Sequence, residues 1–204
     1  MKKLLMIALL VTGIFSLGCG HLLAPNVNTE VAELRPGDYQ LDPEHSAVLF
    51  KVGHMGLSLF VGRFQQVDAS LSYDPEHPEN ARVEVIVDTA SINVNNEAFE
   101  YSLRGSDWLD VEHFPQAIFR ASSIVPAEDN RLIIQGELTF LGVTQPLTVE
   151  ATYNGGALNL LTQRYTLGFS ASAKFQRSQF GLTRFIPAVG DEVQLEIHAE
   201  FQRQ

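Results

Sequence analysis

The sequence has few cysteines and few basic residues. Cys19 is the single cysteine among 204 residues, which excludes an internal disulfide framework and a cysteine-based metal cluster. Lysine and arginine together number 14 against 24 acidic residues, giving a formal net charge of -10. A surface of this sign repels phosphate backbones, so we expect no nucleic-acid partner.

Sequence motifs of common enzymes are also missing. The chain contains no Gly-x-Ser-x-Gly nucleophile elbow, no phosphate-binding glycine loop and no zinc-protease helix signature. The neighbours His45 and Ser46 would point to opposite faces of a strand and cannot form a catalytic pair. We therefore predict that the protein is not an enzyme and carries no cofactor.

The first 19 residues have the pattern of an export signal. Lys2 and Lys3 precede an apolar run from Leu4 to Phe15, which is too short for a stable membrane span. Ser16-Leu17-Gly18 before Cys19 resembles a lipobox, although the leucine lies one position later than usual. We predict a signal peptide of the lipoprotein type over 1–19, with lipidation of Cys19, and a tether over 20–36. Ordinary cleavage is the alternative, and both place the protein in the periplasm or on the bacterial envelope.

From Tyr39 onward the dominant pattern is the alternation of apolar and polar residues, which is typical of strands with one buried face. Turn-forming residues separate these runs, among them Asp74-Pro75 and Asn154-Gly155-Gly156. The clearest runs centre on Val48–Val52, Val83–Val87, Leu132–Phe140, Leu147–Tyr153, Leu167–Ala173 and Val193–Phe201. The pattern predicts an antiparallel barrel or sandwich, and we favour the barrel because closure removes exposed strand edges.

One segment has helical periodicity instead. Asn95 to Gly105 contains a candidate asparagine cap, Glu97 in the first turn, Phe99 and Leu103 one turn apart, and a terminal glycine. We predict a short helical insertion that covers one mouth of the barrel.

The sequence Asp-Pro-Glu-His occurs twice, beginning at Asp42 and at Asp74. Carboxylate and imidazole groups can bind metal ions if they converge. However, Asp followed by Pro is typical of a turn. We interpret the repeats as two turns and predict no metal site.

Several blocks of residues resemble the YceI-like, or polyisoprenoid-binding, family, and the resemblance extends from Tyr39 to about Phe201. The blocks are Leu41-Asp42 with His45-Ser46, Phe50–Gly56, Val61–Phe64, Ser91–Asn93, Leu103-Arg104, Ser106–Asp110, Phe114-Pro115 with Phe119, Gly136–Thr144, Arg177–Leu182 and Val189–Val193. Tyr39 and Ser102 stand where the family usually has Trp and His, so we expect contacts at the cavity mouth or with the headgroup to differ from those of other members.

The resemblance implies an all-β fold over 37–204, an eight-stranded antiparallel lipocalin-like barrel with the short helical insertion. It also implies that the interior binds an elongated apolar lipid, an isoprenoid or fatty-acyl chain, for carriage, storage or sensing in the bacterial envelope. Eight strands leave an interior that is filled by side chains or holds one small ligand, so this function is physically allowed.

The candidate ligand-binding residues are mainly aromatic and β-branched, since the chain contains 13 phenylalanines. His54 lies in phase with inward residues, either as a buried core histidine or as a contact to a lipid headgroup. Arg177 is a candidate anion contact, with a structural role in a turn as the alternative. The full set is Val48, Phe50, Val52, His54, Phe60, Phe64, Phe119, Phe140, Phe169 and Arg177.

Two other functions remain open at this point. One is an enzyme that acts on an apolar substrate in the same interior, with His54 as acid or base. The other is a solidly packed barrel whose loops bind another envelope protein, which predicts that there is no cavity. The sequence also leaves open whether the barrel forms a homodimer.

Overall fold

A computed structural model of the chain describes residues 25–30, 34–74, 77 and 80–204. Strands dominate it: β1 (Gly37–Leu41), β2 (Ala47–His54), β3 (Ser58–Phe64), β4 (Val67–Tyr73), β5 (Arg82–Asp88), β6 (Ile92–Asn93), β7 (Gln116–Pro126), β8 (Arg131–Phe140), β9 (Val143–Leu158), β10 (Tyr165–Gln176) and β11 (Val189–Arg203). The helical elements are α3 (Glu97–Arg104) and the 3-10 turns η2 (Pro43–His45), η4 (Thr89–Ser91) and η5 (Arg177–Phe180). The predicted signal peptide and Cys19 lie outside the described residues.

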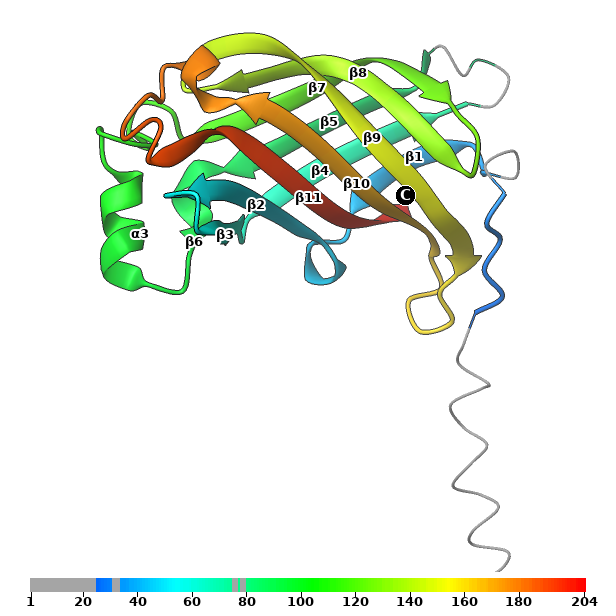
Figure 1. Cartoon of the computed structure of the whole chain (residues 1–204). Coiled ribbons are helices and arrows are strands. Elements are labelled where there is room, and N and C mark those ends of the chain that lie inside the picture. Colours follow the sequence, from blue (N-terminus) through cyan, green and yellow to red (C-terminus); the bar gives the residue numbers. More distant parts are fainter. Residues whose placement is uncertain (1–24, 31–33, 75–76, 78–79) are drawn as a thin grey trace, which may run out of the picture.

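The strands close into a barrel. Hydrogen-bonded neighbours follow the order β1-β4-β5-β7-β8-β9-β10-β11, and β11 pairs with β1 to complete the ring (Figure 1). The pairings in this ring are antiparallel. The predicted eight-stranded antiparallel barrel is therefore confirmed, and the sandwich alternative is wrong.

Three further strands extend one end of the barrel wall. β2 pairs with β11 next to β1, β3 pairs with β2, and β6 pairs with the end of β3. β1 and β2 thus lie end to end along β11, separated by the turn η2. Pro43 begins this turn and Asp42 caps it by accepting a hydrogen bond from the Glu44 N–H. Because proline has no N–H to donate to a strand partner, the strand is interrupted here.

Two groups of buried side chains fill the two ends of the barrel. Near α3 the core contains Ile92, Leu103, Leu109, Phe119, Leu138, Phe140 and Phe180. At the opposite end it contains Leu34, Tyr39, Leu41, Tyr153, Tyr165, Leu167 and Phe201. Most of these residues come from alternating strand positions, as expected for side chains on the inner face of a barrel. The exceptions are Leu34, Leu103, Leu109 and Phe180, which lie outside the strands.

The helix α3 lies at one end of the barrel (Figure 1). The Asn96 side chain accepts a hydrogen bond from the Phe99 N–H at 3.1 Å, and Gly105 ends the helix. Arg104 donates to the carbonyl oxygens of Ala90 (2.7 Å) and Ile92 (3.2 Å), which attaches the helix to η4 and to the start of β6. The predicted helix between Asn95 and Gly105 is confirmed. None of the helices in the described part of the chain is long and apolar enough to cross a bilayer.

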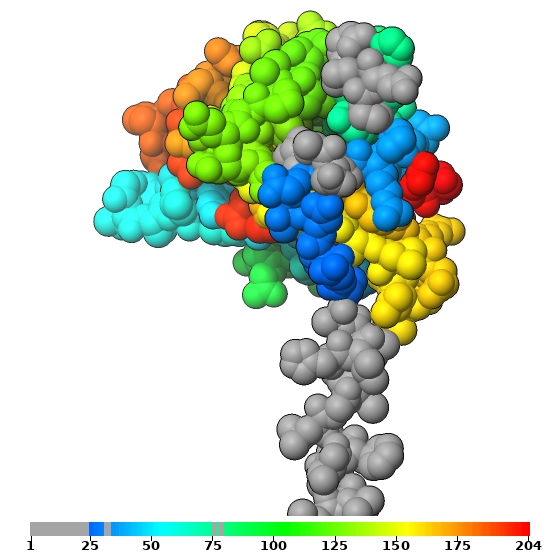
Figure 2. All heavy atoms as spheres, turned by 90° about the vertical axis from the view of Figure 1, so that its right-hand side faces the viewer, coloured from blue at the N-terminus to red at the C-terminus, as the bar shows by residue number. Residues whose placement is uncertain are grey.

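The described residues of the predicted tether contact the barrel. Asn28 and Gly156 exchange two backbone hydrogen bonds, of 2.9 and 2.7 Å, and Leu34 is buried. Figure 2 shows this end of the barrel, where the N-terminal residues lie beside the connection between β9 and β10. Residues of the described segments 25–30 and 34–36 are thus joined to the barrel.

Gly136 on β8 offers a test of the packing at the barrel wall. A Cβ atom at this position would overlap the carbonyl oxygen of Arg120 and the ring of Phe119. We predict that Gly136→Ala destabilises the protein by about 1–3 kcal/mol, the usual cost of overpacking. The measurement is the free energy of unfolding in urea.

Gly168 on β10 provides the control for this substitution. Its added Cβ atom would lie 3.7 Å from the nearest side-chain atom, an ordinary contact. Gly168→Ala should therefore change the free energy of unfolding by less than about 0.5 kcal/mol. Equal effects of the two substitutions would contradict this account of the wall.

Candidate functional site

The barrel encloses a cavity of ≈ 220 Å³ that all eight of its strands line. Its lining is almost entirely apolar, since Ser46, Tyr73 and His198 are its polar residue types. The other lining residues are Leu34, Leu41, Ala47, Val48, Val67, Ala69, Leu71, Ala81, Val83, Val85, Val87, Ala117, Phe119, Ile124, Pro126, Leu132, Ile134, Leu138, Leu147, Val149, Ala151, Phe169, Ala171, Leu195, Ile197, Ala199 and Phe201. Such a space favours an apolar occupant over a charged one.

Small residues in register leave part of this space open. Ala151 on β9 lies opposite Ala171 on β10, and Ala171 lies opposite Ile197 on β11. Ala69 and Ala199 add two more short side chains to the lining. Since a methyl group fills little of the interior of a barrel, these positions keep a channel between the surrounding valines and leucines.

Aromatic rings fill the barrel near α3. The rings of Phe140, Phe175 and Phe180 contact one another at centroid distances of 5.3 to 6.2 Å, in edge-on arrangements. Phe140 and Phe180 are buried, and Phe175 packs against them. Packed rings of this kind leave no room for a ligand, so the cavity ends before it reaches this cluster.

The opposite end carries three tyrosines and the N-terminal segment. Tyr39 donates from its hydroxyl to the carbonyl oxygen of Arg35 at 2.8 Å, and the Arg35 guanidinium lies 4.2 Å from the centre of the Tyr165 ring. Burial raises the pKa of Tyr39 and of Tyr153, so both phenols stay neutral. Leu34, next to Arg35, lines the cavity. The end of the cavity is thus covered partly by this segment.

The sequence-predicted site residues separate into two groups. Val48, Phe119 and Phe169 line the cavity, as expected. The others lie elsewhere: Phe50, Phe64 and Phe140 belong to the packed core near α3, Phe60 contacts Phe99 of the helix, and Val52 is buried outside the lining. The sequence prediction did not include the aliphatic residues of β4 and β5, because it selected phenylalanines and only the valines at positions 48 and 52. The alternation at Val83, Val85 and Val87 was the available signal.

The expectation that His54 points into the interior is wrong. His54 ends β2 and is exposed, pairing in register with Ser58 and Val189. His54 lies on the same face of β2 as the buried Val52, two residues further along, but it is the last residue of the strand and is followed by the exposed turn 55–57.

Arg177 is 2% exposed and directs its guanidinium at backbone carbonyl groups. It donates to the carbonyl oxygens of Gly190 (2.8 Å), Leu182 (2.8 Å), Arg184 (2.9 Å) and Val189 (2.9 Å). These bonds hold the loop between η5 and β11 against the barrel. Arg177 is not among the residues that line the cavity.

Comparisons with known proteins agree on one family. The family model of the YceI-like domain matches residues 39–201. A UPF0312 protein of Shewanella baltica is 32% identical over 169 residues, which cover 82% of this chain and 88% of the relative. A UPF0312 protein of Yersinia pestis is 32% identical over 165 residues, covering 80% and 85% respectively.

Solved structures share the fold. BcnA of Burkholderia cenocepacia superposes with a TM-score of 0.70 at 26% identity, over 78% of this chain and 98% of that one. The YceI protein of Campylobacter jejuni gives a TM-score of 0.65 at 25% identity, over 76% and 91%. A polyisoprenoid binding domain from Saccharophagus degradans superposes with a TM-score of 0.62 at 12% identity, over 83% of this chain and 100% of that one. This is a likeness of fold alone.

Replacing Arg177 tests its role in the loop. We predict that Arg177→Met lowers the free energy of unfolding by at least about 2 kcal/mol, because it removes four hydrogen bonds made by a buried charged group, each of which contributes about 1.5–3 kcal/mol. Arg120→Met is the control, since Arg120 forms an exposed ion pair with Glu84 and should contribute less than about 1 kcal/mol. Urea denaturation measures the free energy of unfolding of both variants. Unchanged stability in Arg177→Met would contradict a structural role for these four hydrogen bonds.

Proposed function

Because the chain belongs to the YceI-like domain family, we propose that its barrel binds the chain of an elongated apolar lipid, an isoprenoid or a fatty-acyl chain. The observation that carries this proposal is the cavity, which is enclosed by the barrel strands and lined by aliphatic and aromatic side chains. Transfer of each methylene from water into such surroundings contributes about 0.8 kcal/mol. The affinity should therefore increase with chain length until the cavity is full.

The size and lining of the cavity support a single chain with its polar head outside. The cavity volume of ≈ 220 Å³ is smaller than the ~300–1,000 Å³ of ordinary ligand pockets, so a narrow chain fits better than a fused ring system. A charged headgroup would lose its hydration among these apolar side chains, and its place is at the mouth. The similar fold of the Saccharophagus domain, named for binding polyisoprenoid, favours an isoprenoid.

We place this function in the bacterial envelope, in the periplasm or at a membrane surface reached through a lipidated Cys19. Carriage, storage and sensing of the lipid all require the same cavity. In a carrier, the lipid must leave the cavity when membranes are offered, whereas a store or sensor keeps it bound. Transfer of a bound fluorescent lipid to vesicles separates these roles.

The cavity favours this proposal over the two rivals. A solidly packed interaction module predicts no cavity, which the ≈ 220 Å³ space in the described barrel contradicts. An enzyme with His54 as its acid or base requires that side chain near the substrate, and His54 is exposed and outside the lining. Binding without chemistry is the function that the described lining supports best.

The direct experiment is to purify the protein from a bacterial envelope, extract it with organic solvent and identify co-purified lipids by mass spectrometry. We expect an isoprenoid or acyl lipid in a 1:1 ratio. The delipidated protein is then titrated with fatty acids of increasing length, and Kd should fall by about fourfold for each buried methylene. An empty extract and no uptake of added lipids would contradict the proposal.

A substitution within the cavity gives a sharper test. Ala171→Phe adds a ring at the centre of the lining, between Ala151 and Ile197, and should weaken binding of a fluorescent fatty acid at least tenfold by occupying the space of the chain. Ser172→Phe adds the same ring one residue along β10, where the side chain is exposed, and should change Kd by less than twofold. Thermal unfolding verifies that both variants fold. Equal affinity in Ala171→Phe would place the lipid outside the barrel.

A further inference from the structure

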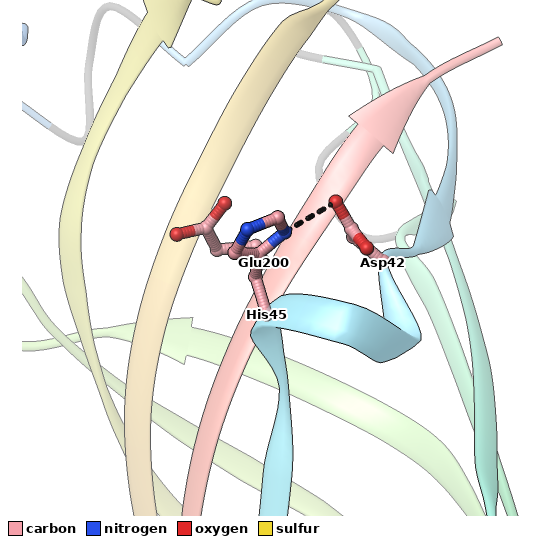
Figure 3. Close-up of side chains that lie close together, drawn as sticks. All are labelled: Asp42, His45 and Glu200. Carbon is pink, nitrogen blue, oxygen red and sulfur yellow. Dashed lines mark hydrogen bonds and ion pairs between the residues drawn. The ribbon is translucent and has the colours of Figure 1, made fainter.

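Three potential metal ligands meet on the outside of the barrel, where η2 interrupts the wall. Asp42 precedes this turn, His45 is its last residue, and Glu200 lies on β11 (Figure 3). One donor atom from each residue lies within 4.8 Å of the other two. Among the described residues, this is the one group of three or more histidine, cysteine or carboxylate side chains that converge in this way.

The backbone holds the two segments together. The Asp42 N–H donates to the carbonyl oxygen of Glu200 at 2.8 Å, and the Glu200 N–H donates to the Ser46 hydroxyl at 3.0 Å. The separation of the three side chains therefore depends on hydrogen bonds at both ends of the turn and not on the side chains alone.

The carboxylate of Asp42 is held in place by its neighbours. Its side chain is 12% exposed, and one oxygen accepts from the Glu44 N–H at 3.1 Å. The other oxygen accepts from the Gln202 amide and pairs with His45 Nδ1 at 3.0 Å. Hydrogen-bonded neighbours of this kind orient metal ligands in proteins and limit the loss of entropy on binding.

We propose that Asp42, His45 and Glu200 bind a divalent transition-metal ion of the Zn²⁺ type. One imidazole nitrogen and two carboxylate oxygens form a donor set that such ions accept, and three protein ligands leave a position for water. Metal–ligand bonds of about 2.1 Å require donor atoms within about 4.2 Å of one another, so the side chains must approach slightly. His45 is 60% exposed and free to make this movement.

Electrostatics at the turn favour a cation. The carboxylates of Asp42 and Glu200 place two negative charges within 4.8 Å of a ring nitrogen of His45. The negative potential of these two side chains attracts a cation to the turn.

The chain contains a matched pair that lacks the third ligand. Asp110 and His113 have the same i,i+3 spacing, with His113 Nδ1 2.9 Å from the Asp110 carboxylate. That pair belongs to no group of three donors among the described residues. If an Asp–His pair were sufficient, the two places would bind metal equally. Only the place beside Glu200 offers a three-ligand site.

The test is a titration of chelator-treated protein, purified without a histidine tag, with Zn²⁺ in a calorimeter. We expect one ion per chain and a Kd at least tenfold weaker in His45→Gln and in Glu200→Gln. His113→Gln should stay within twofold of the parent protein. Co²⁺ titration provides a second measurement, because Co²⁺ in a four-coordinate protein site absorbs visible light more strongly than six-coordinate aqueous Co²⁺, and this absorption should be lost in His45→Gln.

Thermal unfolding of the metal-free variants establishes that each is folded before titration. The proposal is overturned if the parent protein binds no Zn²⁺ at millimolar concentration, or if His45→Gln and His113→Gln have the same effect. It is also overturned if Glu200→Gln binds as tightly as the parent protein. Because these readouts need no lipid, they are independent of the proposed lipid binding.

Discussion

Closure of the barrel by β11 is the constraint on which the rest of the structure depends. This strand pairs with β10 along one edge and with β1 and β2 along the other. Closure pairs the edges of the strands that form the ring, so their alternate residues face a shared interior. The inward positions of β11, among them Leu195, Ile197 and Ala199, become cavity lining for this reason. An interior reached only through the ends can remain apolar.

Side-chain volume then decides which part of the interior is filled. Phe140, Phe175 and Phe180 close the end near α3, whereas Ala151 on β9 and Ala171 on β10 leave space farther from that end. A barrel with large residues at every inward position would be solid, and one with small residues throughout would lose the packing that stabilises it. The distribution of sizes along the strands thus accounts for both the stable core and the cavity.

Local patterns predicted the elements well and the lining less well. The alternation at Val83–Val87 and the cap before α3 depend on neighbours in sequence, so both predictions were correct. Phe140 and Phe169 have the same local pattern, yet one lies among packed rings and the other lines the cavity, because their partners come from other strands. Arg177 shows the same limit, since folding brings together the four carbonyl groups that it contacts.

The Asp-Pro-Glu-His sequence beginning at Asp42 forms a turn, and two of its side chains are also among the proposed metal ligands. The prediction of a turn was correct, and the capping bond uses one oxygen of Asp42. The other oxygen faces His45, and the interruption of the strand brings both residues beside Glu200, 155 positions farther along the chain from His45. The repetition of Asp-Pro-Glu-His in the sequence does not predict that Glu200 lies beside Asp42 and His45. Proline interrupts the strand because it cannot donate to the sheet, and the same interruption leaves the donor atoms of Asp42 and His45 on the outer surface, where an ion can reach them.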